Sequence, residues 1–209
     1  MRASGSVQLR FKTGLTSEEY VKQKAWQSAS LQRCPHHPHG RCGFARHTAY
    51  VRVEPPGAIF ARWYCPESHT TFSLLPDCLA SRLSSTLREV EEVAAAVEAS
   101  EESVERIAQR LRPDIGTQGA VRWVRRRVLG AAVALLAVKG LRPDVLAGAE
   151  PNIHRVRAVL GVEHVLPALR ELAGTQVTAV PAPVGLGHRR ADEHPGRHHL
   201  QHGTGADPP

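Results

Sequence analysis

All four cysteines of this 209-residue chain lie in its first 80 residues, and three of them flank one predicted β-hairpin. Segments 44–54 and 58–65 are rich in strand-forming residues, and a Pro-Pro-Gly turn at 55–57 separates them. An isolated hairpin is at best marginally stable in water. We therefore expect the cysteines to hold this hairpin in place.

A metal site explains these cysteines better than disulfides. The N-terminus lacks the apolar core of a secretory signal, so we expect a reducing, cytoplasmic environment. Cys34, Cys42, Cys65 and His69 form a Cys₃His set that would surround a structural Zn²⁺ ion with tetrahedral geometry and clamp both ends of the hairpin. The wide gap between Cys34 and Cys42 leaves His37 as an alternate ligand, with His39 also in competition. Four unligated thiols are the alternative to a metal site.

The fourth cysteine has a different predicted role. Cys78 follows a Leu-Pro-Asp sequence beyond the hairpin, and we expect a buried thiol there.

Thr16 and Glu19 form a capping box that predicts one short early helix, to about residue 28.

Helical signals dominate after residue 86. Apolar periodicity predicts three consecutive helices over 86–139, with Ser100 and Thr117 as caps of the second and third. One or two further helices over 151–173 should be interrupted near Gly161 and Pro167. The rest of the chain is rich in Gly, Pro and His, and we expect disorder.

The predicted fold class is therefore α+β, built from small modules. A zinc-ribbon β-hairpin precedes a mainly α helix-turn-helix-like bundle and a disordered C-terminal tail. The expected boundaries are an N-terminal arm with a short helix (1–33), the zinc ribbon (34–80), the helix-turn-helix-like domain (86–142), accessory helices (143–173) and the tail (174–209).

The distribution of charge favours a polyanionic partner. The chain holds 27 Lys and Arg against 20 Asp and Glu, a formal net charge of +7. Residues 1–75 and 117–142 each carry +6, the intervening 76–116 carry −4, and 143–209 carry −1. Such clustering is typical of proteins that bind polyanions.

The third helix of the bundle has two different faces. Val121, Val124 and Val128 lie on one predicted stripe, and the opposite side of the N-terminal half is polar and basic. Arginine binds guanine edges and phosphates, so this side suits a DNA major groove. The candidate DNA-binding residues are Gln118, Arg122, Arg125 and Arg126 on the helix, with Arg46, Arg52 and Arg62 of the ribbon as phosphate contacts. The alternative is a solvated basic face on an ordinary bundle.

Short sequence pieces over 34–79 carry a family resemblance, which extends more loosely to about residue 140. The pieces are Cys34-Pro35, Cys42-Gly43, Arg46-His47, Tyr50-Val51-Arg52, Arg62-Trp63-Tyr64-Cys65 and Thr71-Phe72-Ser73-Leu74-Leu75-Pro76. This region resembles the N-terminal zinc-ribbon and helix-turn-helix region of bacterial insertion-sequence transposases and transposon-associated proteins. The resemblance implies recognition of double-stranded DNA.

We expect no catalytic site. Three-carboxylate transposase chemistry needs an α/β core far longer than any segment here, and a zinc hydrolase would need an open metal position with a carboxylate such as Glu67. The expected function is DNA binding in the cytoplasm at the nucleoid, with no membrane association. A separate transposase or a second copy is a further expected partner. The alternatives are a zinc-stabilised protein-interaction module and a non-functional truncated remnant of a mobile element.

Overall fold

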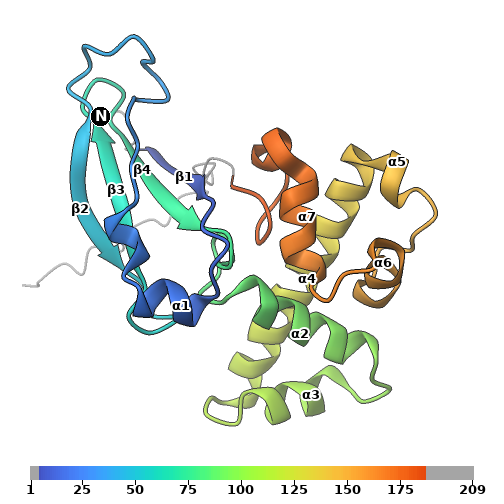
Figure 1. Ribbon diagram of the computed structural model, residues 1–209. Coiled ribbons are helices and arrows are strands. Elements are labelled where there is room, and N and C mark those ends of the chain that lie inside the picture. Colours follow the sequence, from blue (N-terminus) through green and yellow to red (C-terminus); the bar gives the residue numbers. More distant parts are fainter. Residues whose placement is uncertain (1–4, 187–209) are drawn as a thin grey trace, which may run out of the picture.

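The computed structural model describes residues 5–186, and in this range the chain is α+β. A four-stranded sheet forms one half, and helices following the sheet in sequence form the other, beside it (Figure 1). The strands are β1 (Gly5–Phe11), β2 (Ala45–Val51), β3 (Ile59–Cys65) and β4 (Thr70–Pro76). The α-helices are α1 (Ser17–Lys22), α2 (Leu87–Glu98), α3 (Val104–Leu111), α4 (Thr117–Leu141), α5 (Pro143–Leu146), α6 (Ile153–Leu160) and α7 (Val165–Ala173), with 3₁₀ turns η1 (Ala25–Gln27) and η2 (Gly174–Thr178).

The sheet is larger than the predicted hairpin. Strands β2 and β3 form the expected antiparallel pair, and β4 continues it on the other side of β3. Strand β1 then pairs in parallel with β4, giving the order β1-β4-β3-β2. Neither the β3–β4 nor the β1–β4 pairing was predicted, and β1 in particular was missed because a parallel partner far away in sequence leaves no local turn signal.

The two faces of the sheet have different partners. Val7, Phe72 and Trp63 lie in one register row and are buried under segment 28–44, which forms neither helix nor strand. Phe60 and Leu75 point to the opposite face and join the core of the helical half. Alternate residues of one sheet thus contribute to two separate cores.

Helix α2 organises the helical half through two carboxylates. The buried Glu91 accepts hydrogen bonds from the backbone N–H of Leu166 at 2.9 Å and from Arg157 at 2.8 Å. Glu98 accepts from the N–H of Ile153, the first residue of α6. Both N–H groups belong to the first turn of a helix, where they have no partner within the helix. Helix α2 therefore caps α6 and α7 while packing against α4.

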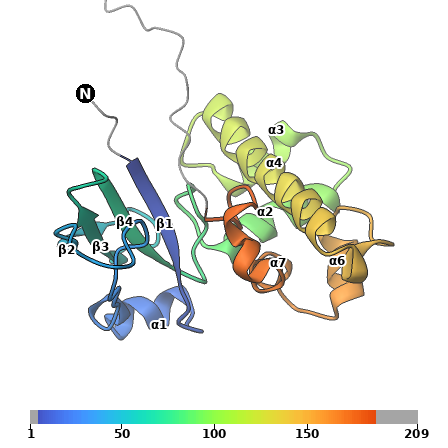
Figure 2. The ribbon, with the colours of Figure 1, turned by 90° about the horizontal axis from the view of Figure 1, so that it is seen from above.

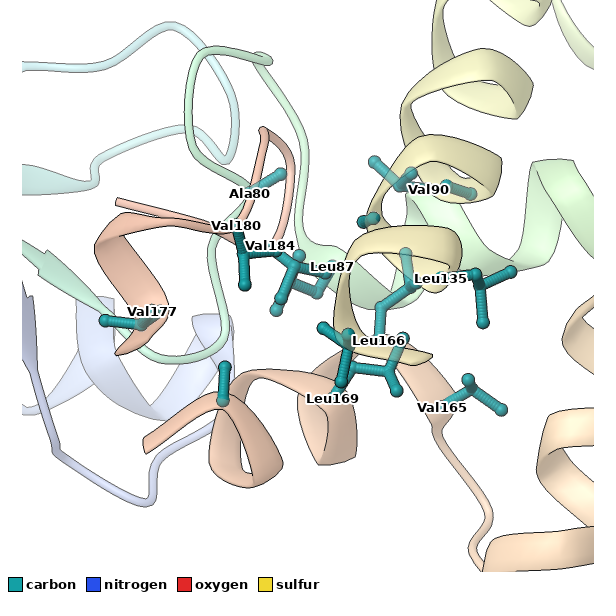
Figure 3. Close-up of a cluster of buried hydrophobic side chains, with 14 of the residues drawn as sticks. Ala80, Leu87, Val90, Leu135, Val165, Leu166, Leu169, Val177, Val180 and Val184 are labelled. Carbon is teal, nitrogen blue, oxygen red and sulfur yellow. The ribbon is translucent and has the colours of Figure 1, made fainter. Parts of the chain in front are cut away.

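The main core joins these helices to the segment that follows α7. Leu87, Leu135, Leu166 and Leu169 meet inside the helical half (Figure 3). Residues 174–186, assigned above to the disordered tail, instead fold back across this core. The buried residues of this segment are Val177, Val180, Val184 and Leu186. The remainder of the predicted tail, 187–209, lies outside the described residues.

One buried arginine ties the two halves together. Arg170 of α7 is 1% exposed, and its guanidinium donates to the carbonyl oxygens of Asp77 and Leu79, at 2.9 and 2.8 Å, just beyond β4. It also donates to Pro183 and Val184, each at 2.8 Å. Burial lowers the pKa of Arg170 to about 10. The side chain thus joins the end of the sheet, α7 and segment 174–186.

Several helix ends differ in detail from expectation. The capping box of Thr16 and Glu19 is present, and the early helix ends at Lys22 before η1. Ser103, rather than Ser100, caps α3, and Gly116 precedes the first residue of α4, Thr117. Gly161 ends α6 with a left-handed backbone, as expected.

Pro167 does not interrupt a helix. It lies in the first turn of α7, where the missing N–H breaks no helical hydrogen bond. Among residues 5–186, no helix combines the length and apolarity needed to cross a bilayer.

Replacing Arg170 with Met should destabilise the whole folded unit. Methionine fills much of the space but leaves several buried carbonyl oxygens without a donor. We expect the free energy of unfolding, measured by urea titration, to fall by about 3 kcal/mol or more. Arg155→Met is the control, because that side chain is exposed and should change stability by less than about 0.5 kcal/mol. Equal effects of the two substitutions would contradict this role of Arg170.

Candidate metal centre and basic helix

Three cysteines and one histidine gather at one end of the sheet. The sulfurs of Cys34, Cys42 and Cys65 and a ring nitrogen of His37 all lie within 4.8 Å of one another. His37 Nδ1 is 3.6 Å from Cys34 Sγ and 3.3 Å from Cys65 Sγ. Around a tetrahedral zinc ion, sulfur and nitrogen ligands are about 3.6 Å apart. The four groups therefore lie close enough to hold a metal ion, and their chemistry is compatible with zinc.

Local backbone turns bring the ligands together. The N–H of His37 donates to the carbonyl oxygen of Cys34, which closes a tight turn and places both side chains on one side. Gly43, directly after Cys42, has a positive φ of 65°, and a Cβ at this position would lie 3.0 Å from Pro66 Cγ. Glycine thus allows the Cys42 loop to approach the end of β3, where Cys65 lies.

Glu67 supports the histidine from outside the cluster. Its Oε2 lies 3.6 Å from His37 Nε2, the ring nitrogen that faces away from the cysteines. A carboxylate beside the second nitrogen of a metal-binding histidine orients the ring and raises its basicity. This placement leaves Nδ1 as the metal-facing atom.

His37, named above as the alternate ligand, occupies the fourth position in place of His69. His69 Nδ1 instead lies 3.3 Å from the hydroxyl oxygen of Tyr64. The backbone of His69 is left-handed, with φ 49°, in the turn between β3 and β4. The two-residue gap between Cys34 and His37 is the sequence signal that favours His37 over the more distant histidine.

Two cysteines of the cluster differ in pKa, since burial raises the pKa of Cys34 whereas that of Cys65 is lowered. Burial alone would raise the pKa of Cys65, but polar groups of Ser68 and the thiols of Cys34 and Cys42 lower it to about 6. A metal binds the thiolate form, so this environment assists binding.

Cys78 lies apart from the cluster and is partly buried rather than fully buried. Burial raises the pKa of its thiol to about 11, which keeps it protonated.

The candidate DNA-binding residues of α4 are all exposed. Gln118, Arg122, Arg125 and Arg126 lie on the outer side of its N-terminal half, whereas Val121 and Val124 are buried. Arg125 lies 3.7 Å from Glu105 of α3, in an exposed pair. The neighbouring Arg127, by contrast, is buried and stacks 3.7 Å from the ring centroid of Trp123.

The three ribbon arginines have different environments. Arg46 is exposed, donates to the carbonyl oxygen of Trp26 at 3.2 Å and stacks over Trp63. Arg52 is buried and donates to the carbonyl oxygen of Ala80 at 2.9 Å, so it supports the fold rather than an outer DNA contact. Arg62 is half-buried on the opposite face of the sheet from Arg46, so the three do not form one surface.

Comparisons with known proteins found no relatives. No family model, curated protein or solved structure matched this chain.

The choice of histidine can be tested directly. His37→Ala should prevent binding of one zinc per chain, whereas His69→Ala should retain it, as measured by metal analysis of the purified variants. Cys78→Ser is a second control and should also retain zinc. Loss of zinc in His69→Ala with retention in His37→Ala would contradict the assignment.

Glu67 should tune the affinity without being required for binding. Glu67→Gln removes the negative charge beside His37, and we expect zinc affinity in a chelator competition to fall about tenfold. Glu163→Gln changes an exposed carboxylate that also lies beside a histidine, on the helical half, and should leave the affinity unchanged. The same affinity in both variants would show that Glu67 does not act on the ligand.

Proposed function

We propose that this chain is a DNA-binding protein in which α4 enters the major groove. The observation that carries the proposal is the exposed basic side of the N-terminal half of α4. The same helix is anchored on its other side by Val121 and Val124, so the arginines are presented by a rigid element. Arginines there would contact base edges and phosphates.

The packing of α2, α3 and α4 supports the interpretation of these helices as a helix-turn-helix-like domain. Helices α2 and α3 both pack against α4, through a shared core that includes Val93, Ala108 and Ala120. The α3–α4 connection, 112–116, is longer than the tight turn of typical motifs. Helix α4 contains no Asp or Glu along its entire length, which favours a polyanion over other partners.

In this proposal, zinc has a structural role. Cys34, His37, Cys42 and Cys65 fill all four positions of a tetrahedral ion, which leaves none for substrate or water. The module would resemble the zinc ribbon of transposase DNA-recognition regions. We propose no catalytic chemistry for this chain, and a separate transposase or a second copy would be its partner at the nucleoid.

A second candidate is a zinc-stabilised protein-interaction module. The C-terminal half of α4 exposes Leu129, Val133 and Leu136, at 65%, 37% and 55%. Their spacing of four and three residues forms one apolar stripe, typical of helix–helix contacts. If assembly with another chain is the primary function, Leu136→Lys should abolish it, and neutralising the α4 arginines should leave it intact.

The arginines of α4 provide the main test of DNA binding. The triple variant Arg122→Gln, Arg125→Gln, Arg126→Gln should remain folded, because all three side chains are exposed, and should lose affinity for duplex DNA. With about six phosphates contacted, the wild-type log affinity should fall with log salt concentration with a slope of about −5. Fluorescence anisotropy with a labelled duplex measures both quantities.

A matched variant separates this effect from loss of net charge. This second triple variant is Lys22→Gln, Arg88→Gln, Arg155→Gln, and it removes three exposed charges from α1, α2 and α6. It should bind duplex DNA nearly as the wild type does. A flat salt dependence, or the same loss in both triple variants, would contradict recognition by α4.

A further inference from the structure

A second basic site lies on the sheet, away from α4. A cavity of about 370 Å³ opens on the face opposite the metal cluster, between the strands and the segment that leads to α2. The polar and charged residues that line it include Gln8, Tyr50, Arg52, Arg62, Ser73 and Arg82.

The charge of this cavity has a single sign. Three arginines line it, and its lining includes no Asp or Glu. The cavities beside Trp123 and beside α7 differ, because each mixes arginines with several carboxylates. A cavity that concentrates positive charge favours an anionic ligand.

The sheet register places polar side chains side by side in this cavity. Ser73 pairs with Gln8 on β1 and with Arg62 on β3, so the three form one row on the same face. Arg62 Nε and Gln8 Oε1 are both buried without a hydrogen-bond partner among the described residues. Buried polar atoms are nearly always satisfied, so this donor and this acceptor leave hydrogen-bonding capacity beside the cavity. A half-turn of the Gln8 amide would present its NH₂ group as a second donor.

Two of the arginines are held before any ligand binds. Arg52 is fixed by the carbonyl oxygen of Ala80 and lies 5.6 Å from the ring centroid of Phe60. Arg62 lies 5.9 Å from the ring centroid of Tyr50, which is itself half exposed. The carbonyl oxygen of Ala80 and the aromatic rings thus orient these guanidinium groups in advance.

We propose that this cavity binds a phosphate group, either as inorganic phosphate or as the phosphate of a small phosphomonoester. Guanidinium groups pair with phosphate oxygens through two parallel hydrogen bonds, and the Ser73 hydroxyl and the Gln8 amide add neutral donors. Tyr50 at the rim offers a ring to an organic group attached to the phosphate. The site is independent of the proposed DNA binding, because no residue of α4 lines it.

The test is calorimetric titration of the zinc-loaded full chain with inorganic phosphate and, separately, with adenosine monophosphate. We expect saturable binding that weakens at least about tenfold in Arg62→Gln. Arg46→Gln is the matched control, since this arginine belongs to the same sheet but faces the other side, and it should bind as the wild type does. Arg62→Lys keeps the charge but loses the paired hydrogen bonds, so its affinity for phosphate should lie between those of the wild type and Arg62→Gln. It also provides a second variant should Arg62→Gln not fold.

Each outcome decides the proposal. Equal affinity for the two probes supports a free-phosphate site, and tighter binding of the nucleotide supports a phosphomonoester that contacts Tyr50. No saturable binding of either probe overturns the proposal, as does equal weakening in the Arg46 and Arg62 variants. The α4 triple variant should keep phosphate binding even if it loses DNA, so failure of one proposal is distinguishable from failure of the other.

Discussion

The structure depends on how segment 28–44 is held against the sheet. This segment forms neither helix nor strand, yet it covers the face that buries Trp63 and Phe72. Its own apolar anchors are few, chiefly Ala29, Leu31 and Phe44. Hydrophobic burial of this size is modest, whereas a metal ion bound by these four side chains would join the segment to β3 at a fixed distance. We therefore regard the Cys34, His37, Cys42 and Cys65 cluster as the main constraint on this half of the molecule.

A second constraint makes the two halves one body. Arg170 contacts the chain just after β4 and again in the last segment described, so sheet and helices cannot separate without exposing its charge. Phe60 and Leu75 of the sheet share a core with Leu87 and Leu135 of the helices. As a result, the basic side of α4 and the arginine-lined cavity of the sheet hold fixed positions in one folded unit. Figure 2 shows the sheet and the helices side by side from above. A ligand in the cavity would therefore contact the same rigid body that presents α4.

Local signals predicted the parts of the fold that depend on neighbouring residues. The hairpin, the capping box at Thr16 and the two faces of α4 follow from short-range patterns, and the structure confirms them. Strand β1 was missed because its partner β4 is distant in sequence. The inward position of Arg52 could not be predicted either, since it depends on the carbonyl oxygen of Ala80, beyond the end of the sheet.

The metal site shows the same limit. Three of the residues predicted as ligands, Cys34, Cys42 and Cys65, lie together in the structure. The fourth could not be chosen from spacing alone, because the chain turns tightly after both Cys34 and Cys65 and both turns contain a histidine. The side-chain positions separate them, since His37 Nδ1 faces Cys34 and Cys65 whereas His69 Nδ1 lies beside the Tyr64 hydroxyl.

X-ray absorption at the zinc edge of the purified full chain tests the central claim most directly. The account predicts three sulfur ligands at about 2.3 Å and one nitrogen ligand at about 2.0–2.1 Å, with one zinc per chain. A shell of four sulfurs would mean that Cys78 had replaced His37, and oxygen ligands would mean an open site. Either result, or a folded chain that takes up no zinc, would contradict a closed structural clamp on the sheet.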